Sequence, residues 1–297
     1  MKIFDLDRGA PVSSPAAPLS IALGSFDGVH IGHRELIRRA QDAGDAAPAV
    51  WTFDANPFGV PYLTSLAEKL ALFREYGVKY ALVSSFEEIR DLSPGEFVDA
   101  LKSRGAARAV CGYNFTFGKD KSGDSGTLRE LCAVRGMACE VVGRVTAGGQ
   151  PVSSTRIRLA LADGGTETAA ALLGRYYSFT APVTHGSEIA RTLGYPTANQ
   201  TVPEGRVRLR RGVYVTRALG RPSITNAGIR PTVVTDGGVV CETHIIGCHE
   251  DLYGSDLKVE FISFLRDERR FDSLDALKAQ LELDVAGAAG FFRCGNV

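Results

Sequence analysis

The chain has 297 residues, of which 44% are hydrophobic and 23% are charged, and its 34 lysines and arginines balance 34 acidic residues. This length favours two domains over one, because a single domain usually has ~100–200 residues. The composition is typical of soluble globular proteins, and it provides no overall charge that would attract nucleic acid or an anionic membrane.

The cysteines and the N-terminal segment both favour a cytoplasmic protein. None of the six cysteines forms a C-x-x-C motif or pairs with a histidine at zinc-binding spacing, which predicts reduced thiols. The first residues, MKIFDLDR, are too highly charged to form the apolar core of a signal peptide. No apolar run approaches the ~20 residues of a membrane span. We therefore expect neither a membrane nor nucleic acid as a partner.

Between residues 19 and 143 the pattern alternates strand and helix. The expected strands are 20–23, 49–53, 80–86, 109–115 and 139–143, and the expected helices are 34–43, 66–77, 94–105 and 127–136. Strands separated by helices of ~10–15 residues form right-handed crossovers. This half of the chain therefore predicts a parallel sheet that is covered by helices on both faces.

After about residue 174, alternating strand patterns follow one another with only turn residues between them. The expected strands are 177–186, 211–220, 239–247 and 257–266, and a helix is expected at 273–284. This pattern predicts an antiparallel sheet that closes into a small barrel. We expect domains at 1–158 and 176–297, joined by two linker helices in 159–175.

The segment GSFDGVHIGH (24–33) stands where the first strand pattern gives way to a helix. In an open parallel sheet, ligands bind beyond the carboxyl ends of the strands. Gly24 and Gly28 permit a sharp turn or a close approach to a phosphate, and the helix that follows offers free N–H groups to an anion. His30 and His33 share one helix face, so the segment is a candidate phosphate clamp. A plain surface loop and a metal site are the alternatives, and the metal site lacks a nearby third ligand in the sequence.

This segment resembles the G-x-F-D-G-x-H-x-G-H signature of nucleotidyltransferases, in particular of the prokaryotic bifunctional riboflavin kinase/FAD synthetases. The resemblance covers nearly the whole chain and includes CGYNFTFGKDKSGD (111–124) and VSSTRIRLALADGG (152–165). It implies an α/β Rossmann-like (HUP-type) FMN adenylyltransferase domain and a C-terminal antiparallel β-barrel riboflavin kinase domain with a terminal helix. ATP, riboflavin and FMN would be substrates, FAD would be the product, and Mg²⁺ would be the cofactor. We expect a monomer or a weak homo-oligomer.

The resemblance implies roles in adenylyl transfer. The implied ATP-binding residues are Gly24, Phe26, Asp27, Gly28, His30, His33, Ser154, Thr155 and Arg156. Of these, His30, His33 and Arg156 would be catalytic, because positive and hydrogen-donating groups stabilise the charge on the phosphates. The residues alone leave simpler interpretations open, since the hydroxyls at 154 and 155 can merely cap a helix and Asp27 can be a turn residue.

The same resemblance implies that Asn114, Phe115 and Asp124 bind the flavin of FMN. Asn114 and Asp124 flank a loop that contains Lys119 and Lys121. Without the resemblance, a polar turn is the better interpretation of this loop.

In the second half, RTLGYPTANQTV (191–202) resembles the G-x-P-T-A-N motif of riboflavin kinases. Thr197 and Asn199 lie two residues apart and so share one side of an extended segment, and the resemblance implies that both bind Mg²⁺ and ATP. Gly186 and Arg191 would belong to the phosphate loop. Glu242 would be the catalytic base that takes the proton of the ribityl hydroxyl. A polar edge strand and an exposed carboxylate are the alternatives.

Two departures from the family pattern weaken these expectations. Asn56 replaces a histidine of the T-F-x-P-H-P motif, and asparagine can donate a hydrogen bond but cannot carry a charge. Ala190 replaces the second glycine of the H-G-x-x-x-G-R motif, and Glu188 adds a negative charge to that loop. If position 190 required a positive φ, alanine would strain the loop by roughly 1–2 kcal/mol.

The sequence therefore predicts a two-step enzyme of FAD biosynthesis, which phosphorylates riboflavin to FMN and then adenylates FMN to FAD. One alternative is an enzyme with only one of the two activities, and another is a non-catalytic flavin-binding module. A module that only binds flavin has no need of both a phosphate clamp and a base. An aminoacyl-tRNA synthetase-like protein is suggested by the letters HIGH, but the chain has no KMSKS-like lysine pair and no charge excess for tRNA.

Overall fold

The computed structural model describes residues 1–5, 17–57, 59–186, 189–229 and 239–293. The chain divides into two compact units, Met1–Ser154 and Thr155–Val297. Glu188, whose charge the sequence places in the kinase phosphate loop, lies outside the described residues. Across the described part of the chain, no helix combines the length and the apolar character needed to cross a membrane.

The first unit is built on a six-stranded parallel sheet with the strand order β1-β4-β3-β2-β5-β8. Its main elements are β1 (Lys2–Asp5), β2 (Leu19–Leu23), α1 (Ile31–Gln41), β3 (Ala47–Phe53), α2 (Leu66–Glu75), β4 (Tyr80–Ser84), α3 (Pro94–Ser103), β5 (Ala106–Gly112), α4 (Ser125–Val134) and β8 (Ala138–Val142). Short hairpins pair β6 (Thr116–Phe117) with β7 (Gly123–Asp124), and β9 (Thr146–Ala147) with β10 (Gln150–Pro151). The predicted alternation of strands and helices is confirmed, and β1 is an edge strand that the sequence pattern did not predict.

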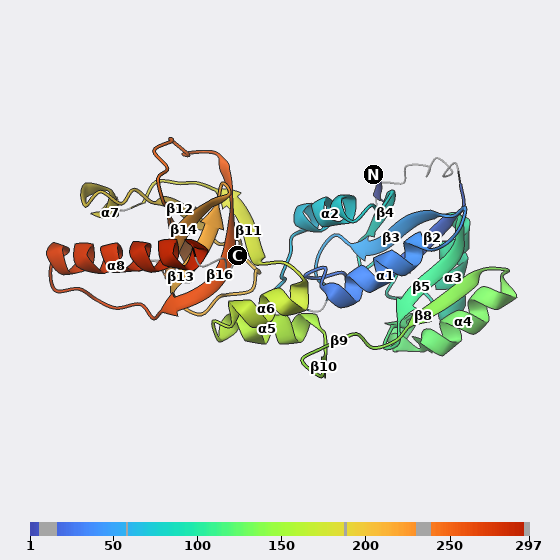
Figure 1. Ribbon diagram of the computed structural model, residues 1–297. Helices are drawn as coiled ribbons and strands as arrows, with labels where there is room; N and C mark the ends of the chain where they lie inside the picture. The colour runs from blue at the N-terminus through green and yellow to red at the C-terminus, as the bar shows by residue number, and fades with distance from the viewer. Residues whose placement is uncertain (6–16, 58, 187–188, 230–238, 294–297) are drawn as a thin grey trace. The chain divides into compact units, whose positions relative to one another are not determined.

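Strand β2 is the centre of this unit, and all five of its residues are buried. Two apolar clusters cover the sheet, one formed with α1 and α2 and the other with α3 and α4. Figure 1 shows these four helices around the strands. The chain runs from β2 outward through β3 and β4 and then returns to place β5 on the other side of β2. The crossovers therefore diverge between β2 and β5, which is where open parallel sheets bind ligands.

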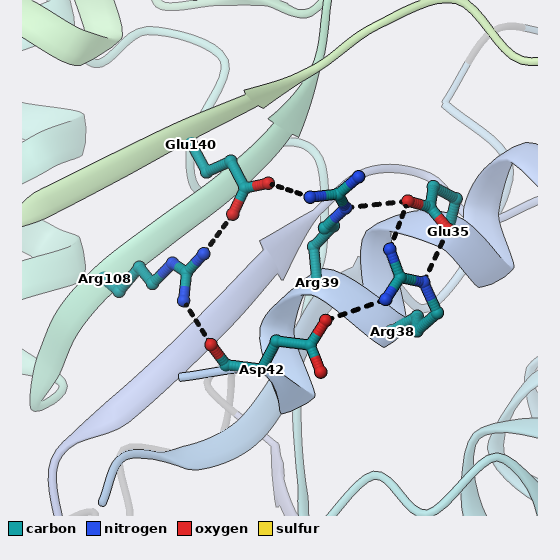
Figure 2. A network of polar contacts seen from close by, with 6 residues as sticks. All are labelled: Glu35, Arg38, Arg39, Asp42, Arg108 and Glu140. Atoms are coloured by element: carbon teal, nitrogen blue, oxygen red, sulfur yellow. Dashed lines mark hydrogen bonds and ion pairs between the residues drawn. The ribbon is translucent and has the colours of Figure 1, made fainter. Parts of the chain in front are cut away.

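A network of ionic side chains fixes α1 to the sheet (Figure 2). Arg39 on α1 and Arg108 on β5 both contact the carboxylate of Glu140 on β8. Arg39 also contacts Glu35 one turn earlier on α1, with 2.7 Å between Nε and Oε1, and Arg108 donates a hydrogen bond to the carbonyl of Asp42 at 3.0 Å. The network holds the C-terminal half of the helix against β5 and β8, and so fixes the direction in which its N-terminus points.

The second unit begins with two short helices and continues as a six-stranded antiparallel barrel. Its elements are α5 (Ser154–Ala162), α6 (Thr166–Leu173), β11 (Tyr177–Pro182), α7 (Ile189–Thr192), β12 (Ala198–Thr201), β13 (Gly212–Ala218), β14 (Arg221–Ile229), β15 (Val239–Ile245), β16 (Asp256–Arg266) and α8 (Leu274–Arg293). The strand order is β11-β16-β13-β14-β15-β12. An antiparallel bridge between Thr184 and Asn199 brings the two ends of the sheet together, so the barrel is nearly closed.

The barrel confirms the predicted antiparallel architecture and its terminal helix, and β14 is a strand that the alternation did not predict. Its interior is partly polar, because buried hydroxyls of three strands bond to one another: Thr225 lies 2.8 Å from the Thr216 hydroxyl and 2.9 Å from that of Thr243. Helix α8 packs outside, against an apolar cluster on β13 and β14. An ion pair of 2.6 Å between Arg266 on β16 and the buried Asp284 ties this helix to the barrel.

Candidate active sites

The histidines of the HIGH segment stack on each other at the N-terminus of α1. Their ring centroids are 3.6 Å apart with an interplanar angle of 10°. His30 is the N-cap of the helix, since its Nδ1 accepts a hydrogen bond of 3.2 Å from the backbone N–H of His33. An Nδ1 that accepts a hydrogen bond is unprotonated, so neutral His30 carries its proton on Nε2. The pair therefore combines a helix cap with an imidazole donor beside the positive end of the helix dipole.

Phe26 is fully buried beneath this pair. Its ring packs at 5.1 Å against the ring of His33 and at 5.2 Å against Phe73 of α2. The Phe26 side chain therefore supports the His33 ring, and its part in binding ATP stays a prediction.

The loop between β2 and α1 is strained, which is common at functional sites. Phe26, Gly28 and Val29 have φ angles of 52°, 82° and 40°. Glycine adopts such angles freely, but a β-branched valine does so only where its surroundings enforce it. Asp27 provides one such constraint, because its Oδ1 accepts hydrogen bonds from the backbone N–H groups of Leu63, at 2.8 Å, and Thr64, at 3.3 Å.

The S-S-T motif meets this same loop. The hydroxyl of Ser154 donates a hydrogen bond of 2.8 Å to the Asp27 carbonyl. The structure therefore brings the two sequence motifs together within the first unit. Thr155 and Arg156 follow in the first turn of α5, the former exposed and the latter partly exposed. Gly24 immediately follows β2, and its N–H donates to the carbonyl of Trp51 at 3.3 Å.

A cavity of about 230 Å³ lies beside the strained loop, at the carboxyl ends of β2 and β3. Asp27 and Asn56 both line it. Asn56 donates a hydrogen bond of 2.8 Å to the carbonyl of Val60, so this replacement of the family's histidine braces the cavity wall. The amide still presents polar atoms to the cavity, but it cannot add the positive charge that an imidazolium would supply.

Lys69 of α2 also lines this cavity, and sequence analysis did not identify it. It is 5% exposed, and its Nζ donates hydrogen bonds to the carbonyls of Phe53, at 2.7 Å, and Ser25, at 3.4 Å, and to the Thr52 hydroxyl at 3.3 Å. Burial lowers the pKa of Lys69 to about 8, against an opposing effect of nearby Asp27. The ammonium group thus joins the end of β3 to the loop after β2. The sequence does contain a signal that could have identified Lys69, since it is a lysine on the apolar face of an amphipathic helix.

The expected flavin-binding residues gather around the small hairpin after β5. Asn114 is exposed just before β6, and Asp124 ends β7, where it pairs in register with Thr116. Phe115 stacks on Phe117 with 5.7 Å between ring centroids. Asp124 also caps α4, accepting 2.8 Å from the backbone N–H of Thr127, and this hydrogen bond lowers its pKa. Strands β2 and β5 are parallel neighbours, so their carboxyl ends lie at the same edge of the sheet. The hairpin after β5 and the histidine loop after β2 therefore both begin at that edge.

In the second unit, three expected kinase residues line one cavity of about 380 Å³. These are Arg191, Thr197 and Asn199, and residues 248–253 also line the cavity. The Asn199 Nδ2 donates to the Thr197 hydroxyl at 3.3 Å, which fixes the two side chains relative to each other. The structure therefore brings together a cation, a hydroxyl and an amide, a set suited to a phosphate chain.

Gly186 packs directly on the side chain of Asn199. A Cβ at position 186 would overlap the Oδ1, Cγ and Nδ2 atoms of that amide. The glycine of the expected phosphate loop is thus required for space. The next residues of the loop, 187 and 188, lie outside the described part of the chain.

Ala190 does not strain the phosphate loop. It lies in the short helix α7 and is absent from the described residues that have positive φ angles. Its carbonyl accepts hydrogen bonds from the N–H groups of Leu193, at 3.1 Å, and Tyr195, at 2.9 Å. Sequence analysis expected strain only if position 190 required a positive φ. The residue is instead in a right-handed helix, a conformation that suits alanine at least as well as glycine.

Glu242 is partly buried in the middle of β15, directly opposite Asn199 on β12. On its other side it pairs with Asn226 of β14, a residue that sequence analysis did not single out. Directly paired residues lie on the same face of a sheet, so the carboxylate shares its face with the Asn199 amide. The predicted base and the predicted phosphate-binding residues thus come from adjacent strands.

Comparisons with known proteins identify a family for each half of the chain. The model of the FAD synthetase family matches residues 13–156, and the model of the riboflavin kinase family matches residues 173–292. The bifunctional riboflavin kinase/FMN adenylyltransferase of Pseudomonas fluorescens is 36% identical over 282 residues, covering 90% of each chain. The enzyme of the same name from Escherichia coli K12 is 35% identical over 300 residues, covering 94% of each chain.

A solved structure shows the same fold over the whole chain. The crystal structure described as a macrolide-efflux protein from Streptococcus pneumoniae superposes with a TM-score of 0.87 and 28% identity, covering 97% of this chain and 99% of that one. That description names another activity, whereas both family models and the curated relatives agree with each other. The chain therefore belongs to the family of bifunctional riboflavin kinase/FMN adenylyltransferases, enzymes that phosphorylate riboflavin to FMN with ATP and then adenylate FMN with ATP to give FAD and pyrophosphate.

Proposed function

We propose that each of the two reactions uses the residues that the sequence motifs indicate, with the kinase in residues 176–297 and the adenylyltransferase in residues 1–158. The observation that supports this assignment best is the cross-strand pair of Asn199 and Glu242 beside the cavity that holds Arg191 and Thr197. It puts a carboxylate next to groups that suit a phosphate chain, as phosphoryl transfer to an alcohol requires.

In the kinase reaction, Glu242 accepts the proton of the ribityl hydroxyl. The hydroxyl oxygen forms a bond to the γ-phosphorus, and the bond from that phosphorus to the bridging oxygen breaks, so ADP leaves with the electron pair. Arg191 stabilises charge on the phosphates. Gly186 allows the loop backbone to lie directly on Asn199, where a side chain would displace the amide.

The oxygen atoms of Thr197 and Asn199 fit Mg²⁺, the metal implied by the family. The Oδ1 of Asn199 is buried and has no hydrogen-bond partner, and a hydroxyl oxygen lies beside the same amide. Magnesium prefers such hard oxygen ligands and usually shares them with substrate phosphates. When bound, the metal would offset the charge that develops on the β- and γ-phosphates.

In the adenylyl transfer reaction, the FMN phosphate is already an anion and needs no general base. Its oxygen attacks the α-phosphorus of ATP, and pyrophosphate leaves. His30 and His33 donate to the phosphates at the positive end of α1. Arg156 neutralises the leaving group, and Asn114, Phe115 and Asp124 hold the flavin. The hydrogen bond from Ser154 to the Asp27 carbonyl supports the assignment, because it joins the two motifs that would share the nucleotide.

We also propose that the enzyme works in the cytoplasm, as a monomer or weak homo-oligomer. Both reactions consume ATP, which is abundant there. The five cysteines among the described residues are free thiols, a state that a reducing compartment maintains.

Product chromatography after incubation with Mg-ATP tests the assignment, with riboflavin as the substrate in one assay and FMN in the other. Wild-type protein should form FAD from both. E242Q should form FAD from FMN but no FMN from riboflavin, whereas H33A should convert riboflavin to FMN and stop there. The activity that each variant retains is its own control, because it shows that the variant protein was produced and is folded. Undiminished kinase activity in E242Q would contradict the role of the base.

A further inference from the structure

Lys69 of α2 holds the strained loop of the adenylyltransferase site at the start of the strain. Its Nζ donates to the Ser25 carbonyl at 3.4 Å and to the Thr52 hydroxyl at 3.3 Å. The Thr52 hydroxyl itself donates to the Ser25 carbonyl at 3.0 Å. Two donors therefore converge on Ser25, the residue before the positive φ angle of Phe26. A third hydrogen bond of 2.7 Å joins Nζ to the carbonyl of Phe53, the last residue of β3.

The segment that leads into α2 holds the same loop at two more points. Leu63 and Thr64 donate backbone hydrogen bonds to the Asp27 carboxylate, and the Thr64 hydroxyl accepts 3.0 Å from the N–H of Gly28. Strained backbone angles persist only where the surroundings enforce them. The loop ends at His30, the cap of α1, so the contacts that maintain the strain also determine where that imidazole lies.

The Lys69 position is unusual for a residue that only fills space. Its side chain is buried, and a buried charge is unfavourable unless it is paired and hydrogen-bonded. An apolar residue on this face of the helix would avoid that cost. The ammonium group has three donors, and it uses them on two carbonyls and one hydroxyl from two separate segments. It therefore fixes the distance between those segments, which an apolar side chain cannot do.

The charged groups around Lys69 belong to the same cavity. Asp27, from the loop after β2, and Asp54, which follows β3, both line the cavity and act on the ammonium group, and Tyr62 lines it as well. On α2 itself, Glu68 is engaged with the N-cap N–H of the helix at 2.8 Å. Among the described residues that line this cavity, Lys69 carries the one cationic side chain. Burial lowers its pKa to about 8, and the two aspartates oppose this effect.

We propose that Lys69 is a positioning residue for adenylyl transfer, because its ammonium group fixes the loop after β2 to the end of β3 and so holds the His30 imidazole where the phosphates of ATP bind. This inference rests on the proposed role of the histidine pair. Charge-assisted hydrogen bonds are roughly twice as strong as neutral ones, and small displacements of a positioned group greatly lower a rate. FAD formation therefore depends on the protonated form of this side chain.

The test measures FAD formation from FMN and Mg-ATP across a pH series in wild type, Lys69→Met and Lys69→Arg. In wild type, kcat/KM should fall above about pH 8, where Lys69 of the free enzyme loses its proton. K69M should lower kcat about tenfold or more, keep the KM for FMN within about twofold, and lack the alkaline limb. K69R keeps its charge throughout, so it should also lack the limb and should be faster than K69M.

The pH profile separates positioning from a purely structural role. Because the pKa of Lys69 is lower in the folded state than in the unfolded chain, the folded state gains stability as the pH rises above about 8. A lysine that only stabilises the fold would therefore cause no loss of FAD formation in this range. Fluorescence of Trp51, which is buried in β3, shows whether the first unit of each variant is folded under the assay conditions.

Lys102→Met is the matched control, since it makes the same substitution at an exposed lysine of α3. K102M should keep the wild-type rate and the alkaline limb, and FMN formation from riboflavin should be unchanged in every variant. A wild-type rate or a wild-type alkaline limb in folded K69M would overturn the inference. If K69M does not fold, K69R decides, because a wild-type limb in that variant would overturn the inference and a missing limb would support it.

His30→Asn, which keeps a capping residue at the start of α1, separates the two proposals. An H30N enzyme that forms no FAD, together with a wild-type K69M profile, would overturn only the role of Lys69. A fully active H30N enzyme would overturn the role of His30 in adenylyl transfer, and the positioning role of Lys69 with it.

Discussion

The imidazole rings of His30 and His33 stack 3.6 Å apart, and the same two residues are joined by the hydrogen bond that caps α1. We assign two tasks to the side chain of His30. The Nδ1 of His30 stabilises the first turn of the helix, and in the proposed adenylyl transfer its Nε2 would donate to a phosphate. The stack fixes the plane of each ring, so both donors are oriented before the substrate arrives.

These two tasks can be separated by substitution at position 30. His30→Ala removes both, so it should lower the stability of the first unit by about 1 kcal/mol and the rate of FAD formation from FMN by about 100-fold or more. His30→Asn keeps a strong capping residue and should restore stability without restoring the rate. Thermal unfolding and FMN adenylation assays measure the two effects, with the kinase rate as a control. An H30N enzyme with wild-type adenylation would show that His30 serves only as a cap.

Gly186→Ala should damage the kinase selectively. The added Cβ overlaps the Asn199 amide, and overpacking of this kind costs roughly 1–3 kcal/mol, equivalent to about a 5- to 150-fold loss of kinase rate if the whole cost falls on the transition state. FAD formation from FMN should not change. Gly290→Ala in α8 is the control, since a Cβ there meets no atom within 4 Å. Equal kinase rates in G186A and G290A would show that the loop adjusts without moving the amide.

Ala190→Gly should not improve the kinase, although it restores the glycine of the family motif. Ala190 already has a helical conformation in α7, so glycine relieves no strain and can weaken the helix by up to about 1 kcal/mol. We expect kinase rates within about twofold of wild type. Steady-state assays with riboflavin would decide, and a tenfold increase would mean that the alanine methyl group hinders the substrate.

The sequence predicted the strand–loop–helix unit around the two histidines well, because a buried strand, two glycines and an amphipathic helix each have a clear local signal. It could not show that Phe26 is buried beneath His33, since a phenylalanine in a glycine-rich loop is compatible with either a core or a ligand contact. The sequence could not predict the conformation of Ala190 either, because a motif shows which residue is usual at a position and not the φ angle of the backbone there.

Strand β14 escaped prediction for a different reason. Alternation identifies a strand when one face is apolar and the other polar. In RPSITNAGI, the residues that point into the barrel include Ser223 and Thr225, whose hydroxyls bond to other buried hydroxyls. The outward face carries Ile224 and Asn226. Because both faces carry polar and apolar residues, the sequence of β14 shows no alternation between them. For the same reason, sequence analysis did not single out Asn226.

Lys69 leads to a prediction about the pH dependence of stability. Its ammonium group joins the carbonyls of Ser25 and Phe53 and the hydroxyl of Thr52, and burial lowers its pKa to about 8. An unfolded lysine keeps its proton up to about pH 10.4. Between these values the unfolded state binds more protons, so the folded state gains stability as the pH rises through this window. The gain should reach at most about 3 kcal/mol.

The measurement is urea unfolding of wild type and Lys69→Met at pH 7 and pH 10. Trp51, the chain's single tryptophan, is buried in β3 and reports on the first unit alone. K69M removes the three hydrogen bonds that the ammonium group donates and should be less stable than wild type at both values, with the difference larger at pH 10. Other groups that titrate in this range contribute equally to both proteins, so the change in the difference isolates Lys69. Lys102→Met, which removes an exposed lysine of α3, should leave the difference from wild type unchanged with pH. The difference in stability between wild type and K69M could instead be the same at pH 7 and pH 10. Lys69 would then keep its proton throughout this range, and the group that joins β3 to the histidine loop would be an ammonium at both pH values.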